Sequence, residues 1–231
     1  MLPELYDDVI SHLKRSPYAA LALHLPSVGY KTEVPGTMQA DAAFIASEVQ
    51  KYADQGKDVV LVAHSYGGLP ATESTKGLAK AERQKQGKSS GLVRLSYMSP
   101  MVLPVEESDP SIIMPDEMLP RAAHPSRSWS ITYGKTAGFI TLTAPSPYLL
   151  FLNDLPKEEA ERWAELSTRH SAFTMPASLS HAGFKDVPIF VPGVRERSSA
   201  GVRTPAREHW YDGRANWGRH RCNRFGLWPC A

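Results

Sequence analysis

The sequence predicts an α/β fold, a parallel sheet with helices on both of its faces. Short apolar runs alternate with polar stretches of helical periodicity, and the runs occupy residues 18–23, 59–62, 91–98 and 187–191. This alternation is typical of buried parallel strands joined by helices. In addition, the second run leads through Ser65 into two glycines, an order that indicates a strand, a sharp turn and a helix.

A short helix and a buried strand are expected first. Within residues 4–15, Leu5, Val9 and Leu13 are four positions apart, which is the spacing of one apolar helix face. Residues 18–23 form an apolar run that leads to a loop containing Pro26, so we expect a buried strand there.

A longer helix is expected before the serine. Thr37 is a favourable N-cap residue, and Ile45, Val49 and Tyr52 would share one face of the helix that follows it. Gly56 stands where the C-cap of this helix is expected.

Beyond Ser65 the pattern predicts two further helical regions. Residues 69–88 favour an exposed helix that is interrupted near Gly77. Residues 157–170 favour a helix, and Asp154 and Pro156 just before them are signals for a helix start.

Composition divides the chain into four parts. Residues 1–100 are expected to form the core, and residues 186–193 return to it as a strand. Residues 101–185 break the alternation and are rich in proline, methionine and aromatic residues, which favours a cap inserted over an apolar pocket. Residues 194–231 form an atypical tail.

The tail differs from the rest of the chain in charge and residue usage. It holds eight of the fifteen arginines, no lysine, three acidic residues and three of the five tryptophans, so its net charge is +5 in a chain of net charge +2. Because no periodicity is sustained we expect disorder, and translation from a shifted reading frame or an unspliced intron would account for this composition. Nucleic-acid binding by the arginines and aromatic residues is an alternative that needs more assumptions. Zinc binding is a second alternative, but it fits poorly, because the spacing of the candidate ligands matches no known zinc pattern. These candidates are His209, His220, Cys222 and Cys230.

Ser65 is the candidate nucleophile. A serine hydroxyl reacts poorly at neutral pH, and a tight turn after a strand lifts it clear of its neighbours so that a base can reach it. Such a turn strains the backbone and requires small residues two positions before and after the serine, here Ala63 and Gly67. The alternative is that Ser65 merely caps a helix.

This pattern resembles the α/β-hydrolase superfamily, and most of all its fungal and bacterial esterase-like members. The resemblance covers roughly residues 1–191 and rests on residues 25–29, Asp41, Ile45, residues 59–68 and residues 97–104. It implies that Ser65 is the nucleophile and that the backbone N–H of Tyr66 donates a hydrogen bond to the oxyanion. It implies no metal and no organic cofactor.

Compared with that family, the predicted fold is incomplete at both ends. The chain starts at what resembles the helix after the loop that supplies the second oxyanion donor, so the oxyanion hole is expected to be half built. The family also places an acid after the strand matched by residues 187–191 and a histidine near the C-terminus. Glu196 is the acid available there, and His209 and His220 are the histidines in the right order.

The remaining histidines and acids are expected to be structural. We expect His64 to pack or to lie near the oxyanion rather than to act as a base, because neighbours on a strand point to opposite faces. His24 is expected to be satisfied by the backbone. His170 and His181 are expected to form hydrogen bonds. Solvated loop charges are expected at Glu106, Glu107 and Asp109, although some superfamily members carry their acid there.

The sequence therefore predicts a serine hydrolase of a small ester or related acyl substrate, acting in small-molecule metabolism. The alternatives are a catalytically inactive fragment and a non-hydrolytic enzyme on the same fold. No run approaches the about 18 apolar residues of a membrane span, and the first residues lack a secretory signal. A cytosolic protein without membrane or nucleic-acid partners is expected.

Overall fold

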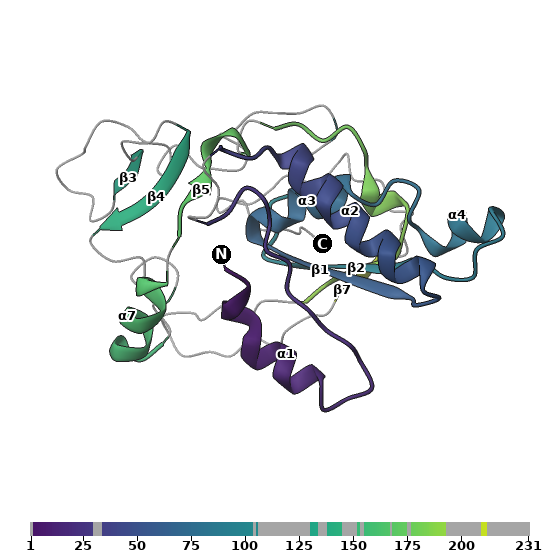
Figure 1. Ribbon diagram of the computed structural model, residues 1–231, viewed down its shortest axis with the longest axis horizontal. Coiled ribbons are helices and arrows are strands. Elements are labelled where there is room, and N and C mark those ends of the chain that lie inside the picture. The colour runs from purple at the N-terminus through teal and green to yellow at the C-terminus, as the bar shows by residue number, and fades with distance from the viewer. Residues whose placement is uncertain are drawn as a thin grey trace. The chain divides into compact units, whose positions relative to one another are not determined.

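The computed structural model divides the chain into two compact units (Figure 1). The first comprises Met1–Asp41 and Met114–Ala177, and the second comprises Ala42–Ile113 and Ser178–Ala231. The structure describes residues 2–29, 34–103, 105, 130–133, 138–144, 152, 155–166, 168–174, 177–192 and 209–211.

A four-stranded sheet forms the centre of the second unit. Its strands lie in the order β1 (Val59–His64), β2 (Leu92–Met98), β6 (Ile189–Val191) and β7 (His209–Tyr211). β2 pairs in parallel with both β1 and β6, and β7 is antiparallel to β6. Parallel strands connected by helices confirm the predicted α/β class, and β1, β2 and β6 are strands that the sequence predicted.

The helices next to this sheet begin and end at recognisable signals. They are α2 (Met38–Asp54), α3 (Gly68–Glu73) and α4 (Lys80–Lys85), with the 3-10 turns η2 (Ser65–Gly67) and η4 (Gly183–Lys185). Thr37 caps α2 as predicted, because its hydroxyl oxygen accepts the N–H of Ala40 at 3.1 Å. Gly56 adopts a φ of +80° just beyond the end of α2, which is the predicted C-cap conformation. In Figure 1 the ribbons of α2 and α3 run along one side of β1 and β2.

Apolar side chains of the helices and strands form the core of this unit. The helices contribute Ile45, Val49 and Leu69, and the strands contribute Leu95 and Ile189, all of them buried. Burial of each such side chain stabilises the fold by roughly 1.5–3 kcal/mol. The apolar helix face predicted after Thr37 therefore lies inward.

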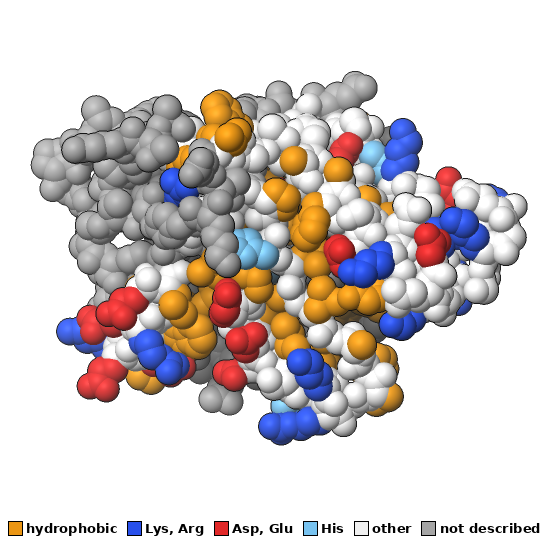
Figure 2. All heavy atoms as spheres, viewed as in Figure 1, with side chains coloured by type: hydrophobic (Ala, Val, Ile, Leu, Met, Phe, Trp, Pro, Cys, Tyr) orange, Lys and Arg blue, Asp and Glu red, His pale blue; other side chains and the backbone are white. Residues whose placement is uncertain are grey.

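Arg83 links α4 to the end of α2. Its buried guanidinium donates from Nη2 to Oδ1 of Asp54 at 2.6 Å and from Nε to the Ser90 carbonyl at 2.7 Å. The hydrogen bond from Arg83 holds the pKa of the exposed Asp54 carboxyl below its usual range. Figure 2 shows basic and acidic side chains gathered on the surface around α4. The break between α3 and α4 falls at Gly77 (φ +76°), as the sequence predicted.

The first unit contains a second, antiparallel sheet. Its order is β3 (Ser130–Tyr133), β4 (Phe139–Ala144) and β5 (His170–Ser171). The helical elements of the unit are η1 (Pro3–Tyr6), α1 (Asp7–Leu13), α7 (Lys157–Glu165) and η3 (Ala172–Thr174). None of the described helices of the chain combines the length and apolar character that a bilayer crossing requires.

A buried serine–aspartate pair organises the loop before α2. The backbone N–H of Ser27 donates to Oδ1 of Asp41 at 3.0 Å, and its hydroxyl donates to Oδ2 at 2.5 Å. Both side chains are fully buried. Two hydrogen bonds offset part of the cost of burying a carboxylate, so this pair fixes the loop against the start of α2.

Three predicted elements differ from the structure. Residues 18–23 form no strand, and Tyr18 and Leu21 are 68% and 49% exposed. An apolar run becomes a strand only where a neighbour pairs with its backbone, and no described strand runs beside this one. The helix predicted over 4–15 exists as η1 and α1, but its expected apolar face is open, because Val9 is 58% exposed.

The third difference is the helix predicted over 157–170. It starts after Pro156 and ends at Glu165, because His170 and Ser171 pair with β4 instead. The tail is also not wholly irregular, since residues 209–211 form β7 against β6. About half of the predicted cap, 101–185, and most of the tail, 194–231, lie outside the described residues, so both boundaries stay predictions.

His170 is buried in the first unit. Its Nε2 lies 3.3 Å from the Thr174 hydroxyl, and its backbone is bridged to Val28. The hydrogen-bonding role predicted for this histidine is therefore confirmed. Burial lowers the pKa of His170 to about 4, because an imidazolium there would lose its hydration.

This burial predicts an acid-labile fold. The unfolded chain binds a proton at His170 near pH 6.5, and the folded chain does so only near pH 4. The free energy of unfolding therefore falls by about 3 kcal/mol as the pH falls through that window. We expect His170→Gln to remove this part of the pH dependence, measured by urea unfolding at pH 7 and pH 4. His12→Gln on exposed α1 is the matched control and should follow the parent chain. Equal pH dependence in the parent and His170→Gln would contradict this prediction.

Candidate active site at the carboxyl end of β1

Ser65 lies at the apex of the turn between β1 and α3. Its φ is +52°, a left-handed conformation that costs a non-glycine residue on the order of 1–3 kcal/mol. The predicted strand, strained turn and helix are therefore all present. The alternative of a helix cap is wrong, because Gly67 and not Ser65 occupies the N-cap of α3. Among the described residues, nothing is hydrogen-bonded to the Ser65 hydroxyl.

The loop after β2 closes onto this turn. The N–H of Met101 donates to the Ser65 carbonyl at 2.8 Å. A Cβ at Gly68 would overlap the Met101 carbonyl oxygen and lie 2.9 Å from Cβ of Pro100, so only glycine fits at this position. At Gly67, a Cβ would meet no described atom within 4 Å. The small residue that the turn requires is thus Gly68 rather than Gly67, because the crowding comes from the β2 loop, which lies far from the turn in sequence.

A hydrogen-bond chain ties β2 to the first turn of α3. The hydroxyl of Thr72 donates to the Gly68 carbonyl at 2.6 Å and lies 2.6 Å from the hydroxyl oxygen of Tyr97. Because the single Thr72 proton is used on Gly68, Tyr97 is the donor to Thr72. Burial raises the pKa of the Tyr97 phenol, which keeps this donor protonated. The sequence gives no sign of these hydrogen bonds, because nothing in the spacing of residues 72 and 97 indicates contact.

Tyr66 and His64 flank the serine in sequence. Tyr66 is the second residue of η2, and its side chain is buried. His64 ends β1 and is partly buried, which lowers the pKa of its imidazole. The packed role predicted for His64 agrees with this burial, and the role of the Tyr66 N–H stays a prediction.

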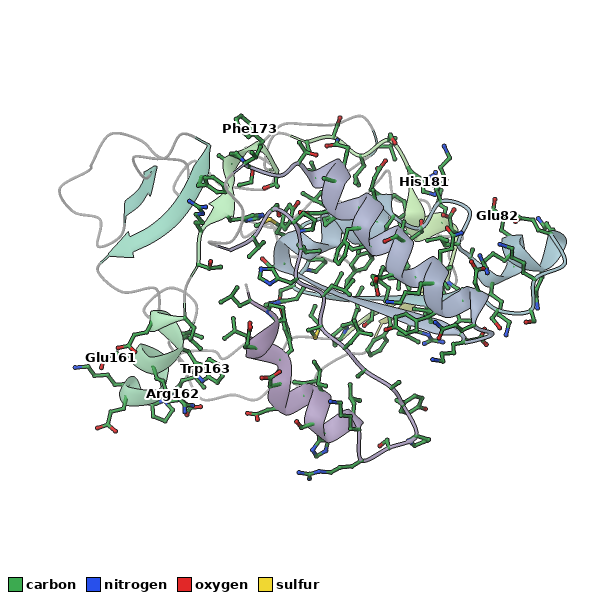
Figure 3. All side chains as sticks on the ribbon, in the orientation of Figure 1. Glu82, Glu161, Arg162, Trp163, Phe173 and His181 are labelled. Carbon is green, nitrogen blue, oxygen red and sulfur yellow. The ribbon has the colours of Figure 1, made fainter. Side chains whose placement is uncertain are left out.

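A histidine–aspartate pair lies in the same unit but at the other edge of the sheet. Nε2 of His181 is 2.5 Å from Oδ2 of Asp186, which also accepts the Thr75 hydroxyl at 2.8 Å (Figure 3 labels His181). Asp186 precedes the amino end of β6, whereas Ser65 follows the carboxyl end of β1. Leu61 of β1 and Ile189, the first residue of β6, both pair with Leu95 of β2, so they lie at the same height along the strands. Ser65 is four residues beyond Leu61, which corresponds to about 13 Å of strand rise.

The pair therefore serves to hold the segment before β6 and cannot relay a proton to Ser65. Glu73, at the end of α3, reinforces the same segment by accepting the backbone N–H groups of Ser180 and His181 at 2.8 and 3.2 Å, together with the Ser180 hydroxyl. The sequence predicted a hydrogen bond for His181, and its partners depend on a loop conformation that the sequence does not specify.

The predicted acid and base of the triad are only partly described. Glu196 and His220 lie outside the described residues, as do Glu106, Glu107 and Asp109. His209 begins β7, and its backbone is paired to Val191 at the end of β6. β7 is three strand spacings, about 14 Å, from β1. In this unit, the described side chains place no histidine–carboxylate pair at the edge that carries Ser65.

The histidine before the first loop is satisfied by the backbone, as predicted. Nε2 of His24 donates to the Val28 carbonyl at 2.9 Å, which fixes the proton on that nitrogen. Within the described part of the chain, no three side chains of histidine, cysteine, aspartate or glutamate gather at a point that could hold a metal ion.

The geometry around Ser65 agrees with comparisons to known proteins. A family model described as "Alpha/beta hydrolase family" matches residues 3–218. The chain belongs to the α/β-hydrolase family. Its fold class and the resemblance noted in the sequence are thereby confirmed.

Two fungal relatives carry the name of a hydrolase. The α/β hydrolase nvfD of Aspergillus novofumigatus is 28% identical over 187 residues, which cover 80% of this chain and 70% of that protein. The probable hydrolase R7 of a Phoma species is 27% identical over 186 residues, which cover 80% of this chain and 68% of that protein. These matches support a hydrolase and leave its substrate open.

Solved structures share the fold at low identity. An extracellular α/β hydrolase from a Paenibacillus species, described as homologous to tobacco salicylic acid binding protein 2, matches with a TM-score of 0.58 and 16% identity over 82% of this chain and 71% of that one. A tomato methylketone synthase I variant in complex with β-ketoheptanoate matches with a TM-score of 0.52 and 12% identity, covering 86% and 76%.

The two neighbouring glycines after the turn provide a matched test of its geometry. We expect Gly68→Ala to destabilise the fold by about 2 kcal/mol or more, because the added methyl meets backbone that cannot move aside. Gly67→Ala should cost less than about 1 kcal/mol, because Gly67 has helical φ and ψ and open space around it. Urea unfolding of both variants measures the difference. Equal destabilisation would show that the β2 loop does not press on the turn in solution.

Proposed function

We propose that this chain is a serine hydrolase of a small ester or related acyl substrate. The observation that carries the proposal is the left-handed φ of Ser65 in a turn that β1, α3 and the β2 loop hold in place. Strain of this kind persists only where the surrounding structure imposes it, and it clusters at functional sites. A nucleophile presented on such a turn is the arrangement that acyl transfer by serine requires.

In the proposed reaction, the Ser65 hydroxyl oxygen attacks the acyl carbonyl carbon. The Ser65 proton passes to a general base while the carbonyl oxygen takes the negative charge, which the backbone N–H of Tyr66 stabilises. Collapse of the tetrahedral intermediate expels the alcohol, which takes the proton from the same base, and water then releases the acid from Ser65 by the reverse sequence. His209 or His220, with Glu196, are the residues proposed for the base and its acid partner.

The fungal relatives support the hydrolase part of this proposal. Both are named hydrolases, and the tomato variant of the same fold is described in complex with β-ketoheptanoate, a short β-keto acid. No metal or organic cofactor is part of the proposed chemistry. The cytosolic location, the cap over the pocket and the role in small-molecule metabolism remain predictions from the sequence.

A second candidate is a fold of this family without hydrolytic turnover. This candidate is favoured because, at the carboxyl edge of the sheet, the described side chains of the second unit place no histidine–carboxylate pair next to Ser65. Without a general base the serine would remain a weak nucleophile, and the protein would bind an acyl compound or catalyse a non-hydrolytic step.

Active-site labelling separates the two candidates. We expect a fluorophosphonate probe to modify Ser65, and Ser65→Ala to lose the label together with at least about a 1,000-fold fall in p-nitrophenyl acetate hydrolysis. Ser47→Ala, which changes an exposed serine on α2, is the control and should label like the parent chain. A folded parent chain that does not label would reject the hydrolase and favour the second candidate.

A further inference from the structure

A second strained serine lies beside the first. Among the described residues, the non-glycine residues with positive φ are Ser65 (+52°) and Ser99 (+42°). Each is the residue that directly follows a strand, β1 for Ser65 and β2 for Ser99. The last residues of these two strands, His64 and Met98, are paired in register, so the two serines leave the same edge of the sheet on adjacent strands about 4.8 Å apart.

The conformation of Ser99 is unfavourable for two reasons. A positive φ crowds the Cβ of any residue other than glycine. Ser99 also precedes Pro100, and the ring of a proline restricts the residue before it to extended conformations. The strain is therefore maintained by contacts elsewhere in the structure rather than by local preference.

The contacts that maintain it belong to the Ser65 turn. Two residues after Ser99, Met101 donates its N–H to the Ser65 carbonyl at 2.8 Å, and Pro100 and Met101 pack against Gly68. The loop that begins at Ser99 and the turn that begins at Ser65 thus hold each other in place. Any substrate that reaches Ser65 at this edge also approaches the start of the β2 loop.

The Ser99 hydroxyl is available to a ligand. Ser99 is exposed, and none of the described residues is hydrogen-bonded to its side chain. A hydroxyl one strand away from the proposed nucleophile can donate to, or accept from, a polar group close to the acyl carbon. A hydrogen bond of this kind favours the substrate that makes it over one that lacks the group.

We propose that Ser99 is a substrate-binding residue of the same site and that it selects acyl compounds with a hydroxyl or keto oxygen a few bonds from the reacting carbonyl. This inference rests on the proposed function of Ser65 as the nucleophile. It adds a specificity determinant and a substrate class to that function. No bond is formed or broken at Ser99, which acts by hydrogen bonding.

The test compares two substrates that differ by one hydroxyl. For p-nitrophenyl 3-hydroxybutanoate against p-nitrophenyl butanoate, we expect the parent chain to favour the hydroxylated ester by about tenfold in kcat/KM. Ser99→Ala and Ser99→Gly should both lose this preference while Ser65 still takes the fluorophosphonate label. The alanine variant keeps the strain and the glycine variant relieves it, so a shared loss points to the hydroxyl rather than to the backbone.

A binding measurement keeps the inference separate from turnover. In Ser65→Ala, ethyl 3-hydroxybutanoate should bind about tenfold more tightly than ethyl butanoate by ligand-observed NMR, and Ser65→Ala/Ser99→Ala should bind both equally. If the binding preference is present but the parent chain neither labels nor turns over, the hydrolase proposal fails and the assignment of Ser99 stands. If the preference is absent in the parent chain, or survives in Ser99→Ala, the assignment of Ser99 is overturned.

Discussion

The parallel pairing of β1 with β2 is the constraint on which the site depends. Because parallel strands run in one direction, their carboxyl ends meet at one edge, and the register from Val60 to His64 brings both strands to an end at the same level. The chain must leave this edge twice within a few ångströms. It does so through two left-handed serines, Ser65 and Ser99, and strain is thereby concentrated where the proposed chemistry takes place.

Helix α3 is fixed at both of its ends by residues distant in sequence. At its first turn, Tyr97 and Thr72 reach the Gly68 carbonyl through two short hydrogen bonds, and the β2 loop packs on Gly68. At its last turn, Glu73 accepts backbone N–H groups from the segment before β6. A helix of six residues has little stability of its own, so these contacts decide its position and, with it, the position of the turn.

The two edges of the sheet carry different kinds of polar group. At the amino edge, His181, Asp186 and Thr75 are hydrogen-bonded to one another. At the carboxyl edge, the hydroxyls of Ser65 and Ser99 have no hydrogen-bond partner among the described residues. Polar groups that are hydrogen-bonded to one another stabilise the fold, whereas polar groups without such partners can bind a ligand. This difference agrees with the general placement of ligand sites at the carboxyl ends of parallel strands.

Local signals in the sequence determined the strands β1, β2 and β6, the limits of α2 at Thr37 and Gly56, and the turn at Ser65, because apolar periodicity, capping residues and glycine act over a few positions. Local signals failed for residues 18–23, since an apolar run needs a partner strand that the sequence cannot supply. Only the tertiary structure decided that Gly68 rather than Gly67 is the crowded glycine and that Tyr97 supports the turn. It also decided that His181 pairs with Asp186 at the edge opposite Ser65, and that Ser99 lies beside Ser65. Each of these depends on strand register and on contacts between distant residues, which arise when the chain is packed and have no signature along it.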